Sequence, residues 1–417
     1  MSHLTKVFIV VAWSLALLPG PSTGQVQGTL AAGDLDLGLA EVEAWASRLS
    51  PRARALGHRL DSLEASRRED LTWSNPAVAY DHEESDVARE WQFTLHKRFT
   101  RPFARGASRL AWDDRLEAEV LKNTHELGLL AADLKAGYVR LRLMDDQLDR
   151  LRDLADLVDL AAETARLRRA EGELSGLEEQ LIRLAASSLR AGELRIRSEQ
   201  RRLRADWQVG MGIPPSTTVR LTTPVDFRAV DPGSIAALQA AGETSAGNLS
   251  ALAMASALDR QAEAVRPGLI PGFDIYGGYK SFAGDSSGIV AGVALDLPLF
   301  DRGNGAAERL QAERRLVDSD RQADLARRRA ETGALAASVM EAQPLLDEFR
   351  EAVVGVSLTG ALLLSYREGA ITLDELLGAI QIESSALSDY FEGLADYYRD
   401  IFRLEALTGA GIVHFAP

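Results

Sequence analysis

The side chains that most often carry out chemistry are scattered in this sequence. No two histidines stand at the close helical spacing that a zinc site needs; they are His3, His58, His82, His96, His125 and His414. The chain has no cysteine, which excludes disulfides, thiolate metal sites and a catalytic thiol. It also has no glycine motif for binding phosphate or a dinucleotide. These residues predict no enzyme activity, no cofactor and no resident metal.

Acidic side chains gather instead around two expected helical turns. They are Glu171, Glu173, Glu178 and Glu179 at the first turn, and Glu368, Asp374 and Glu375 at the second. In a symmetric assembly around a pore, acids at helix tips form rings, and carboxylate rings select cations. The alternative is that they are ordinary acids of a first helical turn, favoured there by the helix dipole.

Each of these turns ends a very long helical pattern. Residues 106–171 and 303–368 each span 66 residues, or roughly 100 Å of helix at 1.5 Å per residue. Apolar residues recur along both at alternating spacings of three and four, which predicts coiled-coil packing. Pro344 lies within the second run, where we expect a bend. Return helices are expected over about 174–211 and 372–409, after glycine stop and serine or threonine cap signals.

Strand patterns precede both long helices, over about 72–100 and 272–300. One face of these strands is apolar and is expected to meet lipid: Trp91, Phe93, Leu95, Ile289, Val293 and Leu295. The other face is polar and is expected to line a lumen: Gln92, Thr94, His96, Arg98 and Asp296. The alternative is an edge strand of a soluble sheet.

The number of strands has a consequence if they enter a membrane. Four strands cannot close a barrel, and an open sheet edge in lipid leaves backbone groups unpaired at a cost of several kcal/mol each. Several copies of the chain would therefore have to share one barrel.

The two halves of the sequence repeat one another. Gly172 and Gly369 are 197 residues apart, as are Gly212 and Gly409, and each glycine closes a helical stretch. We divide the mature chain into a first unit over 25–212, a proline-containing connector over 213–233 and a second unit over 234–417. Helices are also expected over 34–70, with a kink or break at Ser50-Pro51, and over 234–264.

The N-terminus and the net charge restrict the location and the partners. Lys6 precedes the apolar run Val7–Leu18, and small residues Ser22 and Gly24 precede an expected cleavage point, so residues 1–24 are predicted to be a secretory signal peptide. No later stretch reaches eighteen apolar residues. The net charge of −14 argues against a nucleic-acid partner.

Four segments carry a resemblance to a known family. They are residues 297–303 (LPLFDRG), 366–369 (YREG), 373–377 (LDELL) and 404–409 (LEALTG). Together with the long helices, the strand pairs and the two-fold repeat, they resemble the TolC family of outer-membrane efflux proteins. The resemblance covers almost the whole mature chain and is more specific in the second unit.

The resemblance implies a mixed α/β membrane protein. Its four strands per protomer would form a 12-stranded β-barrel in a homotrimer, above a coiled-coil α-helical tunnel. It implies localisation in the outer membrane of a Gram-negative bacterium, contact with outer-membrane lipid, and a large periplasmic portion. The implied partners are a periplasmic adaptor (membrane fusion) protein and an inner-membrane pump of the RND or ABC type.

The same resemblance assigns a periplasmic gate and adaptor-docking tip. The residues are Gly172, Glu173, Gly369, Asp374 and Glu375. Glu375 corresponds most nearly to the acid of a periplasmic constriction, but Gly378 stands where some members have a second aspartate. The short chain and Asn75-Pro76 are more similar to the heavy-metal cation efflux branch than to the drug efflux branch.

The expected function is therefore that of a passive exit duct in a tripartite efflux system for small solutes, either metal cations or drugs. Two alternatives stay open at this point. One is the exit channel of a type I protein secretion system. The other, from a different class, is a soluble periplasmic coiled-coil scaffold whose strands pack on a protein core.

Overall fold

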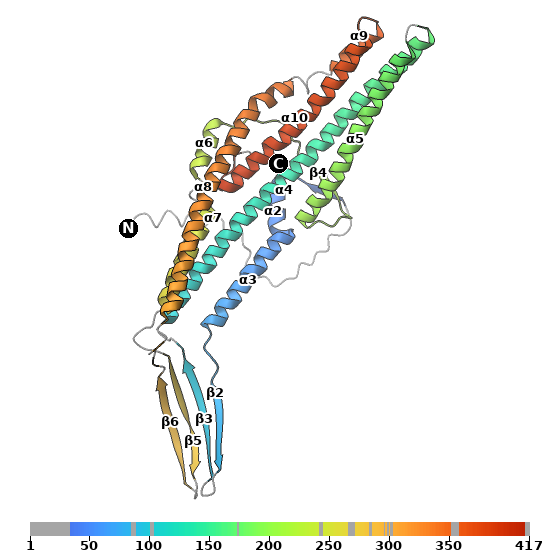
Figure 1. The fold of residues 1–417 in the computed structure, drawn as a ribbon. Helices are drawn as coiled ribbons and strands as arrows, with labels where there is room; N and C mark the ends of the chain where they lie inside the picture. The colour runs from blue at the N-terminus through green and yellow to red at the C-terminus, as the bar shows by residue number, and fades with distance from the viewer. Residues whose placement is uncertain are drawn as a thin grey trace.

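The computed structural model describes residues 34–84, 89–100, 104–172, 175–241, 245–265, 272–282, 286–295, 297, 300, 303–351 and 358–412. The expected signal peptide over 1–24 lies outside these residues. The molecule is elongated, with four strands at one end and two helical turns at the opposite end (Figure 1).

Both halves of the chain use the same order of elements. The first half contains α2 (Leu39–Leu49), α3 (Pro51–Leu71), β2 (Ala77–Glu84), β3 (Arg89–Phe99), α4 (Arg105–Ala170) and α5 (Gly176–Met211). The second contains α7 (Ala246–Val265), β5 (Phe273–Phe282), β6 (Ser286–Leu295), α8 (Asn304–Phe349), α9 (Leu358–Arg367) and α10 (Leu373–Thr408). Between the halves lie β4 (Thr218–Leu221) and α6 (Pro232–Ala241), and β1 (Asp34–Leu37) precedes α2.

Local sequence signals set several helix ends. Ser50 accepts a hydrogen bond from the Ala53 amide and Pro51 occupies the first helical position, so the expected break separates α2 from α3. Gly212 and Gly409 end α5 and α10 with φ values of 72° and 78°. This left-handed conformation favours glycine, since a side chain is strained there.

The helical expectation was wrong for residues 34–37. These residues form β1, which pairs in parallel with β4 of the connector between the halves. The Tyr138 hydroxyl stabilises the pairing because it donates to the Leu37 carbonyl at 3.0 Å and accepts from the Thr223 amide at 2.9 Å. A four-residue strand whose partner lies far along the chain leaves almost no periodic pattern to detect.

The second long run is described as two helices, where the sequence predicted one over 303–368. Helix α8 ends at Phe349, α9 begins at Leu358, and residues 352–357 lie outside the described part of the chain. Pro344 lies inside α8, near its C-terminal end. A proline within a helix removes one backbone hydrogen bond and crowds the preceding turn.

Helix α4 is the axis of the helical part and packs against α5, α7 and α10. Its residues Leu134, Leu141 and Leu148, from the predicted coiled-coil seam, are buried. Trp207 of α5 donates from Nε1 to the Leu134 carbonyl at 2.8 Å. Its ring lies over Gly137, where an added Cβ would approach Trp207 Cδ1 to 2.7 Å. The packing at this level therefore depends on a residue without a side chain.

Candidate functional site

The four long strands form one antiparallel sheet in the order β2-β3-β5-β6. Strands β2 and β6 each have a single neighbour among the described residues, so both outer edges present unpaired backbone groups. Neighbouring strands lie side by side at the end of the molecule remote from the helical turns (Figure 1).

One face of this sheet is apolar and exposed. The register aligns Tyr80, Phe93, Tyr279 and Ile289 in a single row across all four strands. The structure places the six expected lipid-facing residues on this face; they are Trp91, Phe93, Leu95, Ile289, Val293 and Leu295. Ile289 is 89% exposed, which is extreme for an isoleucine in a regular strand.

Aromatic rings gather at both ends of this apolar face. Trp91 lies 5.6 Å from Tyr279 at the end near the strand turns, measured between ring centroids. At the helical end, Phe99 stacks on Phe273 at 5.0 Å and meets Trp73 edge-on at 5.3 Å. Eight residues separate Trp91 from Phe99, or roughly 26 Å of strand. Two aromatic girdles around an apolar band of about this height are typical of membrane barrels.

The opposite face of the sheet is polar and holds charged pairs. His96 Nδ1 lies 3.7 Å from Asp274 Oδ2, and its Nε2 lies 2.9 Å from Thr94 Oγ1. Lys280 Nζ lies 2.8 Å from Glu90 Oε2.

The register also settles which expected lumen residues share this face. Gln92 and Arg98 lie on it with Thr94 and His96, whereas Asp296 falls outside the described residues. Sequence reasoning did not select the charged partners Glu90, Asp274 and Lys280, although all three obey the same alternation.

At the far end of the molecule, the two helical turns are built alike. Gly172 and Gly369 adopt φ values of 82° and 74°. The Gly172 amide donates to the Arg169 carbonyl at 3.0 Å, and the Gly369 amide to the Tyr366 carbonyl at 3.1 Å. Both tip glycines therefore serve a left-handed turn that ends a helix.

Each return helix then begins with a capping box. The Ser175 amide donates to Glu178 Oε2 at 2.8 Å, and the Thr372 amide donates to Glu375 Oε2 at 2.7 Å. The bond from the Thr372 backbone, with a further bond from its hydroxyl, lowers the pKa of Glu375. The structure thus gives Glu375 a local role as a helix cap.

The other expected tip residues have different surroundings. Asp374 is exposed in the first turn of α10, and Glu173 lies outside the described residues. Glu179 is buried between two arginines, with Arg183 Nη2 at 2.5 Å and Arg169 as its second partner. Glu178, Glu179 and Glu375 are therefore engaged within their own hairpins.

The two hairpins contact one another just behind their turns. Arg168 Nη1 of α4 donates to the Tyr366 carbonyl of α9 at 3.3 Å, and its guanidinium lies 5.5 Å from the centroid of the Tyr366 ring. Tyr366 is 2% exposed, and burial raises the pKa of its hydroxyl. A Cβ added to Gly369 would lie 3.1 Å from Arg168 Nη2, so the tip glycine also leaves room for this arginine.

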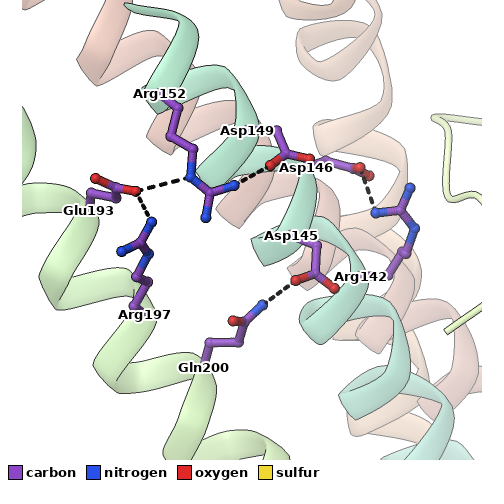
Figure 2. A network of polar contacts seen from close by, with 8 residues as sticks. All are labelled: Arg142, Asp145, Asp146, Asp149, Arg152, Glu193, Arg197 and Gln200. Atoms are coloured by element: carbon purple, nitrogen blue, oxygen red, sulfur yellow. Dashed lines mark hydrogen bonds and ion pairs between the residues drawn. The ribbon is translucent and has the colours of Figure 1, made fainter. Parts of the chain in front are cut away.

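A polar seam joins α4 to α5 farther from the turns (Figure 2). Glu193 of α5 accepts from Arg152 of α4 at 3.1 Å and is also paired with Arg197. Asp145 accepts from Gln200 at 2.7 Å. These contacts connect the two helices along their flank, and the arrangement contains no nucleophile paired with a base.

The described residues provide no resident metal centre. No group of three or more His, Cys, Asp or Glu side chains among them is arranged to hold a metal ion. Likewise, none of the described helices has both the length and the apolar character required to span a membrane.

The fold matches several solved outer-membrane channels. A membrane protein from Pseudomonas aeruginosa superposes with a TM-score of 0.74 at 16% identity, over 89% of this chain and 92% of that chain. VceC, an outer membrane protein of Vibrio cholerae, gives 0.73 at 16% identity, over 89% and 96%. CusC, described as forming a transmembrane channel, gives 0.71 at 12% identity, over 89% and 92%.

These superpositions confirm the fold of the single chain that the TolC-family resemblance implied, with long helices and a four-stranded sheet. The matched proteins are described as membrane proteins or channels, and none as an enzyme. No known family profile matches the sequence, and no curated protein matches it. The similarity is therefore one of architecture.

Proposed function

We propose that three copies of this chain form a passive channel in the outer membrane of a Gram-negative bacterium, with the helices extending as a tunnel into the periplasm. In this proposal it is the exit component of a tripartite efflux system for small solutes. An adaptor and an inner-membrane pump of the RND or ABC type complete the path, and outer-membrane lipid surrounds the barrel.

The observation that carries the proposal is the sheet with two open edges. Its exposed face presents a continuous apolar row from Tyr80 to Ile289, and its other face carries the His96–Asp274 and Lys280–Glu90 pairs. The apolar face is suited to contact with lipid, and the charged face is suited to contact with water in a lumen. An open edge in lipid costs several kcal/mol for each unpaired backbone group. Joining β6 of one copy to β2 of the next removes every edge when three sheets close a 12-stranded barrel.

Within this proposal, the helical tips form the periplasmic gate. The contact between Arg168 and Tyr366 joins the α4–α5 hairpin to the α9–α10 hairpin of the same chain. Widening the tip by moving one hairpin away would break this contact. The candidate tip residues lie close to Arg168 or Tyr366 in the sequence; they are Gly172, Glu173, Gly369, Asp374 and Glu375.

The membrane assignment is tested by extracting the full chain from cells. Release into detergent-free buffer as a monomer would replace the channel by the soluble scaffold alternative, whereas a detergent-requiring trimer supports the proposal. Conductance of that trimer in planar bilayers then tests the pore. Affinity purification of its pump and adaptor distinguishes small-solute efflux from type I protein secretion.

The effect of the Glu375 charge on ion selectivity can be separated from the role of its side chain in capping α10. Glu375→Gln removes the charge and keeps a capping-box side chain. If the carboxylate contributes to a selective ring, cation selectivity falls while stability is retained. The matched control is Glu64→Gln, an exposed acid on α3. Unchanged closed-state conductance and selectivity in Glu375→Gln would remove this residue from the gate.

A further inference from the structure

We propose that Lys97 and Arg105, together with Trp73, bind the phosphate group of phospholipids in the periplasmic leaflet of the outer membrane. The inference rests on the proposed function and deepens it, since it names one class of lipid and the residues that hold it. It concerns the helical end of the sheet, where the apolar face meets α3 and α4.

Lys97 is a basic residue on the apolar face, toward the helical end of the sheet. It lies in the register row of Ile275 and Val293, between Leu95 and Phe99 along β3. Its ammonium group is turned toward the helices, where it donates to the Ser74 carbonyl, and it lies 6.0 Å from the Phe99 ring centroid. A lysine that covers apolar surface with its methylenes and extends its charge toward water is typical of a membrane interface.

Arg105 supplies a second cation at the same level. Its guanidinium lies 3.7 Å from the centroid of the Trp73 ring, and it donates to the Leu71 carbonyl at the end of α3. Trp73 in turn contacts Phe99 of the aromatic girdle at the helical end of the sheet. Among the described residues, neither Lys97 nor Arg105 lies in an ion pair with a carboxylate. Two cations without an acidic partner, beside two aromatic rings, are suited to an anionic headgroup.

A groove adjoins this group. Its lining includes Trp73, Arg105, Trp112, Arg115, Met254 and Leu258. Arg115 lies 5.1 Å from the Trp112 ring centroid. Basic, aromatic and aliphatic side chains thus line one continuous surface between α3, α4 and α7.

 The groove beside Trp73 and Arg105 has a volume of about 1060 Å³. A groove of that size has room for part of a lipid next to Arg105 and Trp73.

The two ends of the sheet differ in charge, which favours the periplasmic leaflet. The end near the strand turns carries the acids Glu83, Glu84 and Glu90 beside the bases Arg89 and Lys280, whereas the helical end carries the bases Lys97, Arg98 and Arg105 beside the acid Asp274. In the proposed orientation, the helical end faces the periplasm. Phosphate groups of that leaflet would therefore meet the basic end of the sheet, and the acidic end would lie at the opposite surface.

The test uses the purified full-length trimer in detergent, with phosphatidylglycerol added, and counts retained lipids by native mass spectrometry. Lys97→Gln with Arg105→Gln is expected to weaken retention roughly 30-fold, because each basic side chain near an anionic headgroup contributes about a factor of five. Lys97→Arg with Arg105→Lys keeps both charges and should retain the lipid. The matched control is Arg48→Gln with Arg54→Gln, two exposed arginines at least roughly 25 Å along the helices from Leu71.

Two further probes identify the ligand. Diacylglycerol, which lacks the phosphate, should be retained poorly, and excess inorganic phosphate should not displace phosphatidylglycerol. Equal retention in the Gln pair and the control pair would overturn the proposal, as would retention of diacylglycerol equal to that of phosphatidylglycerol or displacement by inorganic phosphate. The single variant Lys97→Gln provides the comparison if the double variant does not fold. A conducting trimer with no lipid preference contradicts this inference alone, whereas the absence of a trimer contradicts the proposed function.

Discussion

Replacing Leu95 by arginine distinguishes a lipid-facing strand from a soluble one. Leu95 lies midway between Trp91 and Phe99 on the apolar face, at the centre of the band, and it is 53% exposed. An arginine at the midplane of a membrane barrel costs about 2–4 kcal/mol. That corresponds to a folding equilibrium weakened roughly 30- to 700-fold for each chain. At a position exposed to water, the same substitution changes the free energy of unfolding by no more than about 0.5 kcal/mol.

The assay is urea unfolding of the assembled protein in phospholipid vesicles, with Gln92→Arg as the matched control. Gln92 lies three residues away on the same strand but on the polar face, near Glu90 and Lys280. We expect Leu95→Arg to reduce the stability of the assembly strongly and Gln92→Arg to leave it nearly unchanged. Equal stabilities for the two variants, within about 0.5 kcal/mol, would refute the assignment of lipid to the apolar face.

Three further predictions concern the helical part. Gly137→Ala should destabilise the fold by about 1–3 kcal/mol in denaturant unfolding, because its Cβ would meet Trp207 Cδ1 at 2.7 Å. The control Gly192→Ala should not destabilise the fold, because a Cβ added at Gly192 has no atom within 4 Å. Tyr138→Phe should cost about 1–3 kcal/mol and speed hydrogen exchange at the Thr223 amide, because a buried hydroxyl with two partners is lost. The lowered pKa of Glu375 means that its cap stabilises the turn above the usual carboxyl pKa and is lost as pH falls through the lowered value. The protection of the Thr372 amide from hydrogen exchange, relative to its intrinsic rate at each pH, should therefore fall in acid, and Glu375→Gln should remove this dependence on pH.

The order of the long helices and strands along the chain could be predicted because their sequence patterns are long and occur twice. Helix α4 occupies Arg105–Ala170, where the heptad pattern indicated 106–171. Alternation along β3 and β6 assigned each side chain to a face, since a period of two leaves no other arrangement in a regular strand. Glycine and a following serine or threonine marked both helical turns.

Shorter and more distant features could not be predicted. The parallel pair β1–β4 joins a four-residue strand before α2 to a four-residue strand of the connector, and neither strand has enough residues to show a period. The Arg168–Tyr366 contact joins residues of different hairpins, so no local pattern indicates it. Glu375 was selected for its charge and for the family resemblance, although Thr372 and Glu375 already stand at the T-x-x-E spacing of a capping box, which the sequence reasoning did not use.

The most direct test of the account asks whether β2 of one chain pairs with β6 of another. Because the chain has no cysteine, one cysteine can be placed in β2 and one in β6, scanning positions 77–82 against 288–293. Within one chain these strands are separated by two others, or about 14 Å, too far for a disulfide. If three chains share one barrel, oxidation in membranes should produce a covalent trimer for some pairs of cysteine positions. A monomer that stays in detergent-free buffer and never forms an intermolecular disulfide between these edges would contradict it.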